Sequence, residues 1–194
     1  MQRNVMPSEV KALSKVRKRL GPVGLLCLAV LIFATACGPS AQTVESGNGA
    51  SAEAAPDFAL TLFGTETRQA GETLRLSDLA GKPVVLNFWF PSCPPCVAEM
   101  PEFERVYQSH KADGVEFVGV QLVGIDTAED GQNFVNEVGV TYALGPDEDD
   151  IIMKYQVNGF PMTVFIDQEQ NIVRKWQGIL DEEKLEEILA EIVH

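Results

Sequence analysis

The chain has 194 residues, 45% of them hydrophobic, which suits one globular domain that buries its own core. The formal net charge is −13. Residues 1–36 hold six of the 15 basic side chains and one of the 28 acidic ones, so residues 37–194 keep nine basic and 27 acidic side chains, a net charge of −18. So acidic a surface repels phosphate backbones, which excludes nucleic acid as a partner.

The first 36 residues have the pattern of an export signal. Basic residues up to Arg19 precede an apolar run over residues 23–36, which is shorter than the about 20 residues of a membrane-spanning helix. The end of the run, directly before Cys37, resembles the bacterial lipobox, with Ala34 where leucine is usual. We favour a lipoprotein with the lipid on Cys37, while an uncleaved signal anchor and an ordinary cleaved signal stay open. All three place the domain at the outer side of the bacterial cytoplasmic membrane.

Residues 37–56 are rich in glycine, serine and alanine, which predicts a flexible tether with a mean reach of roughly 25 Å. The folded domain is expected over residues 57–194. Its first segments, Phe58–Leu62 and Thr73–Leu76, predict a β-hairpin, and a helical turn closed by Gly81 follows.

An unbroken apolar, β-prone run over Val84–Phe90 predicts a central strand that is covered on both faces. A helix is expected next, because the prolines at 94 and 95 fit a first helical turn, where a missing N–H does no harm. Pro101 inside this helix predicts a kink. Apolar side chains at helical spacing predict one buried stripe, which consists of Cys96, Met100, Phe103 and Tyr107.

The rest of the domain is predicted as a strand, a helix capped by Thr127, a turn near Gly145-Pro146, a short acidic helix, a hairpin and a last helix capped by Asp181. The alternation of strands and helices predicts an α/β fold with a mixed central sheet flanked by helices and an N-terminal β-hairpin extension. The expected bounds are Val115–Val123, Glu129–Val138, Asp149–Tyr155, Met162–Ile166 and Ile172–Trp176.

Two of the four cysteines, Cys93 and Cys96, lie in the predicted domain. At a helix N-terminus, side chains three residues apart are neighbours, near enough to make and break a disulfide. Cys93 would cap the helix, where the dipole favours a thiolate, and Cys96 would lie one turn inside. The pattern predicts a redox-active pair. A structural disulfide closing so small a loop would constrain the unfolded chain little, and a zinc site would need two more soft ligands.

The prolines between the cysteines predict the direction of the redox chemistry. Neither proline provides an N–H, so a Cys93 thiolate keeps chiefly the amide of Cys96 as a donor. No histidine stands between the cysteines to add positive charge. We therefore expect a moderately acidified thiol and a couple on the reducing side.

Five motifs in order resemble the TlpA/ResA-like thioredoxin family over roughly residues 55–194. They are Ala55-Pro-Asp-Phe58, Gly81-Lys-Pro-Val-Val-Leu-Asn-Phe-Trp89, Cys93-Pro-Pro-Cys96, Glu99-Met-Pro101 and Gly159-Phe-Pro-Met-Thr163. The resemblance implies a thioredoxin fold in which Cys93 attacks and Cys96 resolves, with their disulfide and no other cofactor. Pro161 would be a cis-proline that faces the pair, and the main chain of Phe160 would pair with an extended substrate segment.

The same resemblance implies that Glu99 shuttles a proton to or from a thiol, if partial burial raises its pKa. A solvated glutamate in the first helix is the alternative. Two positions depart from ordinary thioredoxins: Asn87 replaces a buried aspartate, and Ser92 replaces the tryptophan before the first cysteine. Both departures point to a dedicated branch of the family outside the cytoplasm.

The expected function is the reduction of disulfides in exported proteins. The resemblance suggests apocytochrome c as the substrate class and a membrane thiol transporter as the electron donor. Net introduction of disulfides is one alternative. A copper-binding or copper-delivery module is another, against which the lack of a nearby histidine or methionine ligand argues.

Overall fold

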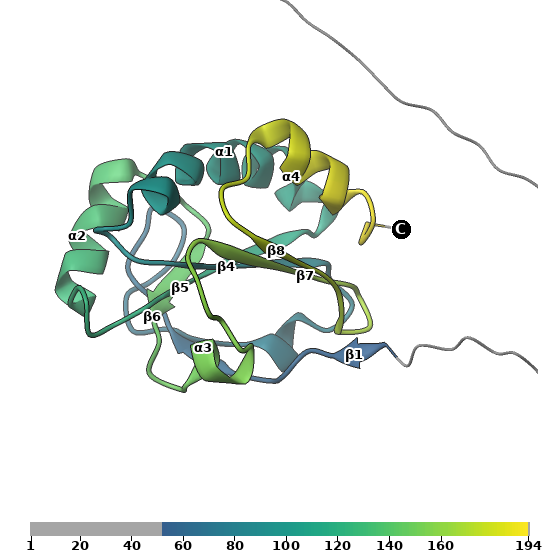
Figure 1. Ribbon diagram of the computed structural model, residues 1–194, viewed down its shortest axis with the longest axis horizontal. Coiled ribbons are helices and arrows are strands. Elements are labelled where there is room, and N and C mark those ends of the chain that lie inside the picture. The colour runs from purple at the N-terminus through teal and green to yellow at the C-terminus, as the bar shows by residue number, and fades with distance from the viewer. Residues whose placement is uncertain (1–51, 194) are drawn as a thin grey trace, which may run out of the picture. The chain divides into compact units, whose positions relative to one another are not determined.

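A six-stranded mixed β-sheet lies at the centre of residues 52–193, the part of the chain that this computed structural model describes (Figure 1). Its strands run in the order β1-β8-β7-β4-β5-β6, and β2 pairs with β3 in a separate two-stranded sheet. The strands are β1 (Glu53–Ala54), β2 (Ala59–Thr61), β3 (Thr73–Arg75), β4 (Val84–Trp89), β5 (Glu116–Gln121), β6 (Ala143–Pro146), β7 (Met162–Ile166) and β8 (Asn171–Gln177). The helices are α1 (Pro94–His110), α2 (Ala128–Val138), α3 (Ile151–Lys154) and α4 (Glu182–Leu189), with short 3-10 turns at Leu76–Leu79 and Lys111–Asp113.

Strand β4 is the middle of the fold, because it pairs with β5 in parallel and with β7 in antiparallel orientation. All six of its residues are buried, as its unbroken apolar sequence predicts. The register sets Phe88 opposite both Val120 of β5 and Met162 of β7. The ends of β4 and β5 and the start of β7 therefore meet at one edge, which we call the carboxyl edge of the sheet.

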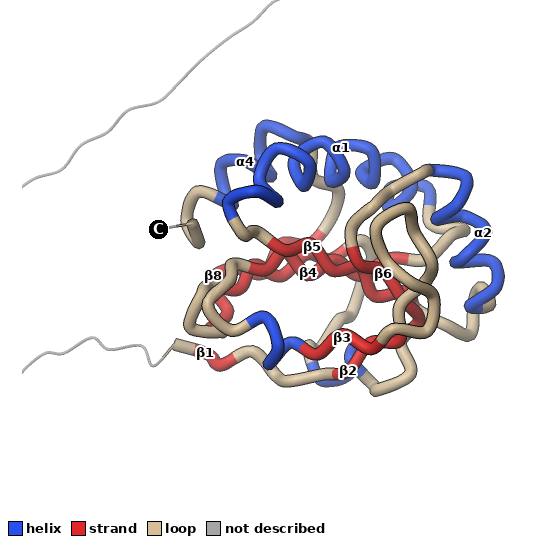
Figure 2. Tube along the Cα trace, turned by 180° about the vertical axis from the view of Figure 1, so that it is seen from behind, coloured by secondary structure: helices blue, strands red, loops and turns tan. Residues whose placement is uncertain are grey.

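The sheet is covered on both faces. Helices α1, α2 and α4 lie on one face, and α3 lies with the β2–β3 sheet on the other (Figures 1 and 2). Each face has its own apolar core, one that includes Phe103 and Phe117 and one that includes Leu60 and Phe88. This arrangement confirms the predicted α/β thioredoxin fold and its N-terminal hairpin.

The helix starts follow the local sequence. Cys93 is the N-cap of α1, and the stripe predicted on that helix is buried at all four positions. The helix continues through Pro101 to His110. At α2, the Thr127 hydroxyl accepts from the amide of Asp130 while the Asp130 carboxylate accepts from the amide of Thr127, which confirms the predicted cap.

The turn predicted near Gly145-Pro146 is wrong, because residues 143–146 form β6, an edge strand parallel to β5. Glycine and proline usually signal a turn, but a proline at the end of an edge strand can leave the ladder intact. The chain turns after Pro146 instead. The predicted acidic helix is shorter than expected and begins at Ile151, whose amide donates to the carboxylate of Asp147.

Strand β1 falls at the end of the segment that was predicted as tether. Glu53 and Ala54 pair with the start of β8, and Lys175 forms an ion pair with Glu53 at 2.8 Å. Glutamate and alanine are weak strand formers, so the open edge of β8 rather than local propensity accounts for this strand. No helix within residues 52–193 is long and apolar enough to cross a membrane. The predicted leader and most of the tether lie outside the described residues.

Replacing Gly145 with alanine should destabilise the protein, because the new Cβ would lie 2.1 Å from the main-chain oxygen of Thr61. Strand β2 would have to move away from β6, so we expect a loss of about 2 kcal/mol in the free energy of unfolding, measured by urea titration. Gly64→Ala is the matched control, since its nearest contact would be the Ala70 Cβ at 3.4 Å. Equal losses in the two variants would contradict the close approach of the strands.

Candidate redox site

Cys93 and Cys96 lie at the carboxyl edge, where β4 passes into α1. They form a disulfide, with their Cα atoms 5.3 Å apart. The amide of Cys93 donates to the carbonyl of Phe90 at 3.1 Å, so a tight turn leads from the strand to the helix. Cys93 is 4% exposed and Cys96 is fully buried, so the cysteine at the helix start is the more accessible one.

The helix start offers few donors to the Cys93 sulfur. Pro94 and Pro95 occupy the first two helical positions and have no N–H. The amide of Val97 donates to the Cys93 carbonyl at 3.0 Å. Within this first turn, the amide of Cys96 is therefore the N–H that remains for a Cys93 thiolate.

Pro161 and Phe160 lie at the same edge of the sheet. The peptide bond between them is cis, as predicted, and β7 begins at the next residue, Met162, which pairs with Phe88 near the end of β4. The rings of Phe160 and Phe90 pack edge to face with their centroids 5.3 Å apart. The fold thus brings the segment before β7 next to the turn that leads into Cys93.

Glu99 is fully buried on α1, one turn beyond Cys96, so the alternative of a solvated glutamate is wrong. Its two oxygens accept from the Asn87 Nδ2 at 2.8 Å and from the Leu180 amide at 3.0 Å. Burial raises the pKa of Glu99 from 4.5 to about 7, although both hydrogen bonds oppose the shift. The group can therefore take up or release a proton near neutral pH.

The two positions that depart from ordinary thioredoxins both take part in the site. The Asn87 Nδ2 also donates to the Thr163 hydroxyl at 3.2 Å, which ties β4 to β7 behind the pair. Ser92 donates to the carboxylate of Asp126. Sequence reasoning missed Asp126, although it follows the end of β5, and the ends of neighbouring parallel strands meet at one edge of a sheet.

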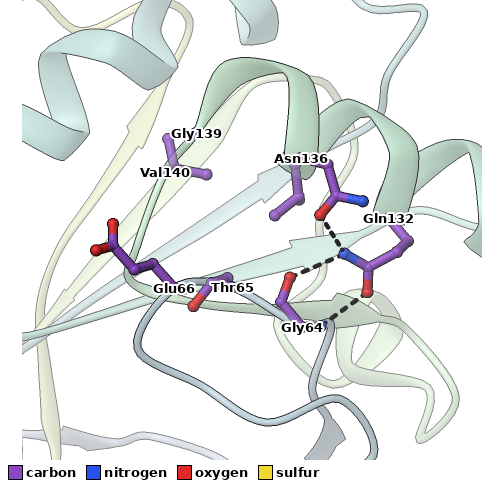
Figure 3. A pocket seen from close by; sticks show the side chains of 8 residues that line it. Gly64, Thr65, Glu66, Gln132, Asn136, Gly139 and Val140 are labelled. Atoms are coloured by element: carbon purple, nitrogen blue, oxygen red, sulfur yellow. Dashed lines mark hydrogen bonds between the residues drawn. The ribbon is translucent and has the colours of Figure 1, made fainter.

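A cavity of about 410 Å³ lies between α2 and the loop after β2, and the redox pair does not line it. The Gln132 side chain holds that loop by accepting from the Gly64 amide at 2.7 Å and donating to the Gly64 carbonyl at 2.9 Å (Figure 3). These contacts give the cavity wall a structural role. Its lining residues are Gly64, Thr65, Glu66, Gln132, Val135, Asn136, Gly139 and Val140.

Two further points concern the predicted lipid anchor and metal binding. Cys37, the predicted lipid anchor, lies outside the described residues. Within residues 52–193, no group of three or more histidine, cysteine, aspartate or glutamate side chains is arranged to hold a metal ion.

Comparison with known proteins shows the family to which this chain belongs. The model of the AhpC/TSA family matches residues 52–175, more than half of the chain. The thiol–disulfide oxidoreductase ResA of Oceanobacillus iheyensis is 38% identical over 141 residues, which cover 72% of this chain and 71% of the relative. The chain belongs to the ResA-like thiol–disulfide oxidoreductases.

Other comparisons agree with this membership. ResA of Bacillus thuringiensis subsp. konkukian is 30% identical over 174 residues, which cover 86% of this chain and 96% of that protein. The exposed lipoprotein thioredoxin Etrx1 of Streptococcus pneumoniae is 26% identical, with a TM-score of 0.60 over 70% of this chain and 99% of that one. The thioredoxin domain of a Bacteroides vulgatus thiol–disulfide oxidoreductase shares the fold, with 24% identity and a TM-score of 0.63 over 74% of this chain and 97% of that one.

The raised pKa of Glu99 predicts a pH-dependent stability. Because the folded pKa of about 7 exceeds the unfolded value of 4.5, the folded state binds the extra proton between these values, and the free energy of unfolding rises as the pH falls. Urea unfolding of the oxidised protein should show a gain of about 3 kcal/mol from pH 8 to about pH 4.5 that Glu99→Gln lacks. Glu183→Gln, on the exposed side of α4, is the control and should keep the gain. An unchanged pH dependence in Glu99→Gln would contradict the assignment.

Proposed function

We propose that this ResA-like oxidoreductase reduces disulfide bonds in exported proteins. The observation that carries the proposal is the environment of the Cys93–Cys96 pair, with two prolines at the helix start and Glu99 buried one turn behind. Few donors stabilise a Cys93 thiolate, and a poorly stabilised thiolate makes the reduced pair give up its electrons more readily.

The exchange takes two steps. The Cys93 thiolate attacks one sulfur of the substrate disulfide and displaces the other as a thiolate, which takes a proton. Cys96 then loses its proton and attacks the Cys93 sulfur, which forms the Cys93–Cys96 disulfide and releases the second substrate thiol. The substrate gains two electrons and two protons, and a dithiol donor returns them to the protein by the reverse exchange.

Glu99 is the proposed acceptor of the Cys96 proton. The two residues lie one turn apart on the buried side of α1, and the pKa of about 7 lets the carboxyl cycle between both forms at neutral pH. In the reverse exchange the donor thiolate attacks Cys93, and the protonated Glu99 would return the proton to the Cys96 sulfur as it leaves the Cys93–Cys96 disulfide.

Phe160 and Pro161 are the proposed binding segment for the substrate. Within residues 52–193 no hydrogen bond to the main chain of Phe160 is found, whereas the Pro161 carbonyl accepts from the Gly178 amide at 2.9 Å. An extended substrate segment that runs past Cys93 could therefore pair with the Phe160 main chain. The packing of the Phe160 ring on the Phe90 ring would hold this main chain in place.

The proposed location is the outer face of the bacterial cytoplasmic membrane, with residues 1–36 as leader, Cys37 as the lipid anchor and residues 37–56 as tether. Two comparisons support this proposal. The match to the Bacillus thuringiensis relative covers 86% of the chain and thus extends into the first 51 residues, and the Streptococcus pneumoniae neighbour is named an exposed lipoprotein.

Apocytochrome c is the proposed substrate class and a membrane thiol transporter the proposed electron donor, both on the family resemblance. Net disulfide formation is the second candidate. It would require a strongly stabilised Cys93 thiolate, whereas Pro94 and Pro95 withhold two possible donors.

Trapping tests the proposed function. Cys96→Ser should leave substrates joined to Cys93, because the resolving thiol is gone, and the trapped partners can be identified by mass spectrometry after non-reducing electrophoresis. Cys93→Ser is the matched control and should trap at least tenfold less, since Cys96 is fully buried. Trapping of exported proteins by neither variant would refute the proposed reduction, and trapping without cytochrome c apoproteins would refute the substrate class alone.

Glu99→Gln should slow insulin reduction at neutral pH by about 100-fold, because the resolving thiol loses its proton acceptor. The inflection near pH 7 in the wild-type rate profile should disappear in the variant. Glu183→Gln should keep both rate and profile. A Glu99→Gln profile that still bends near pH 7 would assign the inflection to another group.

A further inference from the structure

The residue before the attacking cysteine is held by a carboxylate. One oxygen of Asp126 accepts from both the amide of Ser92, at 3.0 Å, and the hydroxyl of Ser92, at 2.7 Å. Ser92 immediately precedes Cys93, so the negative charge lies next to the turn that carries the nucleophile. The serine matters here, because its hydroxyl supplies the shorter of the two hydrogen bonds.

The position of the Asp126 carboxylate is fixed by its own turn. The amide of Leu122 donates to the carbonyl of Trp89 at 2.8 Å, which ties the start of this turn to the end of β4. Gly124 has a φ of 107°, and its amide donates to the carbonyl of Asp126 at 3.3 Å. The carboxylate is thus half-buried at a set place between two strand ends.

The two segments that meet at this carboxylate carry no positive charge to offset it. Residues 90–100 and 122–130 contain no lysine or arginine, and Asp126 takes part in no ion pair within the described residues. None of the other acidic side chains of these two segments binds Ser92 as Asp126 does. Glu99 is buried behind Cys96, Glu129 is exposed on α2, and the Asp130 carboxylate binds Thr127.

We infer that Asp126 is a positioning residue that, held by Ser92, sets the redox poise of the Cys93–Cys96 pair. Its charge disfavours the Cys93 thiolate, which raises the free energy of the reduced form and makes the pair a stronger reductant. The two prolines act in the same direction, because they withhold hydrogen-bond donors from the Cys93 thiolate. The Asp126 charge thus repels a thiolate that few donors stabilise. This inference rests on the proposed disulfide exchange and deepens it.

Asp126→Asn tests the inference, because asparagine keeps an acceptor for Ser92 and removes the charge. The equilibrium constant of the pair with glutathione, measured by mass spectrometry after acid quenching, should shift about five-fold toward the reduced protein. For a two-electron couple this is an increase of about 20 mV in reduction potential. In a Cys96→Ser background, iodoacetamide should alkylate Cys93 about five-fold faster at about pH 6.

Two further variants complete the test. Glu129→Gln makes the same charge change at an exposed residue of α2, three residues from Asp126. Its equilibrium constant with glutathione should stay within about two-fold of the wild-type value. Ser92→Ala keeps the charge and the amide contact, so it should shift the equilibrium less than Asp126→Asn does. It also keeps the test decisive if Asp126→Asn does not fold, because a shift toward the oxidised form in Ser92→Ala would overturn the inference.

An unshifted Asp126→Asn equilibrium, or an equal shift in Glu129→Gln, would also overturn it. Neither result would affect the proposed reductase function. That function would instead fail if the wild-type pair were itself as oxidising as a strong disulfide donor.

Discussion

The burial of one carboxyl group connects the parts of the fold that make the candidate redox site. Glu99 belongs to α1, and its oxygens accept from Asn87 on β4 and from the Leu180 amide just before α4. A buried carboxylate without partners would be strongly destabilising, and these two donors allow the group to stay inside with a pKa of about 7. The same contacts that fix α1 on the sheet therefore hold a titratable group behind Cys96.

Stability and chemistry favour different side chains at this site. Above pH 7 the ionised Glu99 lowers the stability of the fold, and a neutral side chain of the same shape would remove that effect. The proposed proton transfer to and from Cys96, in contrast, requires the carboxyl. At the helix start, the prolines withhold donors and the Asp126 carboxylate lies beside Ser92. Both features fit the reductant that we propose, because each disfavours a Cys93 thiolate.

Elements with strong local patterns were predicted well. The apolar run of β4, the stripe of α1 and the Thr127 cap of α2 all follow from the spacing or type of neighbouring residues. The errors lie where distant segments decide. Gly145 and Pro146 read as a turn, yet the approach of β2 and the free edge of β5 make them a strand. Strand β1 likewise exists because β8 has an open edge.

By itself the sequence determined the candidate cysteine pair, its place at a helix start and the class of fold, because these depend on residues close together along the chain. Only the tertiary structure decided between a solvated and a buried Glu99, since its environment comes from Asn87 and Leu180, 12 and 81 residues away. It alone brought Asp126 to Ser92, 34 residues apart, because the parallel pairing of β4 and β5 sets their ends side by side. Burial and charge at a site depend on such pairings, and no local pattern encodes them.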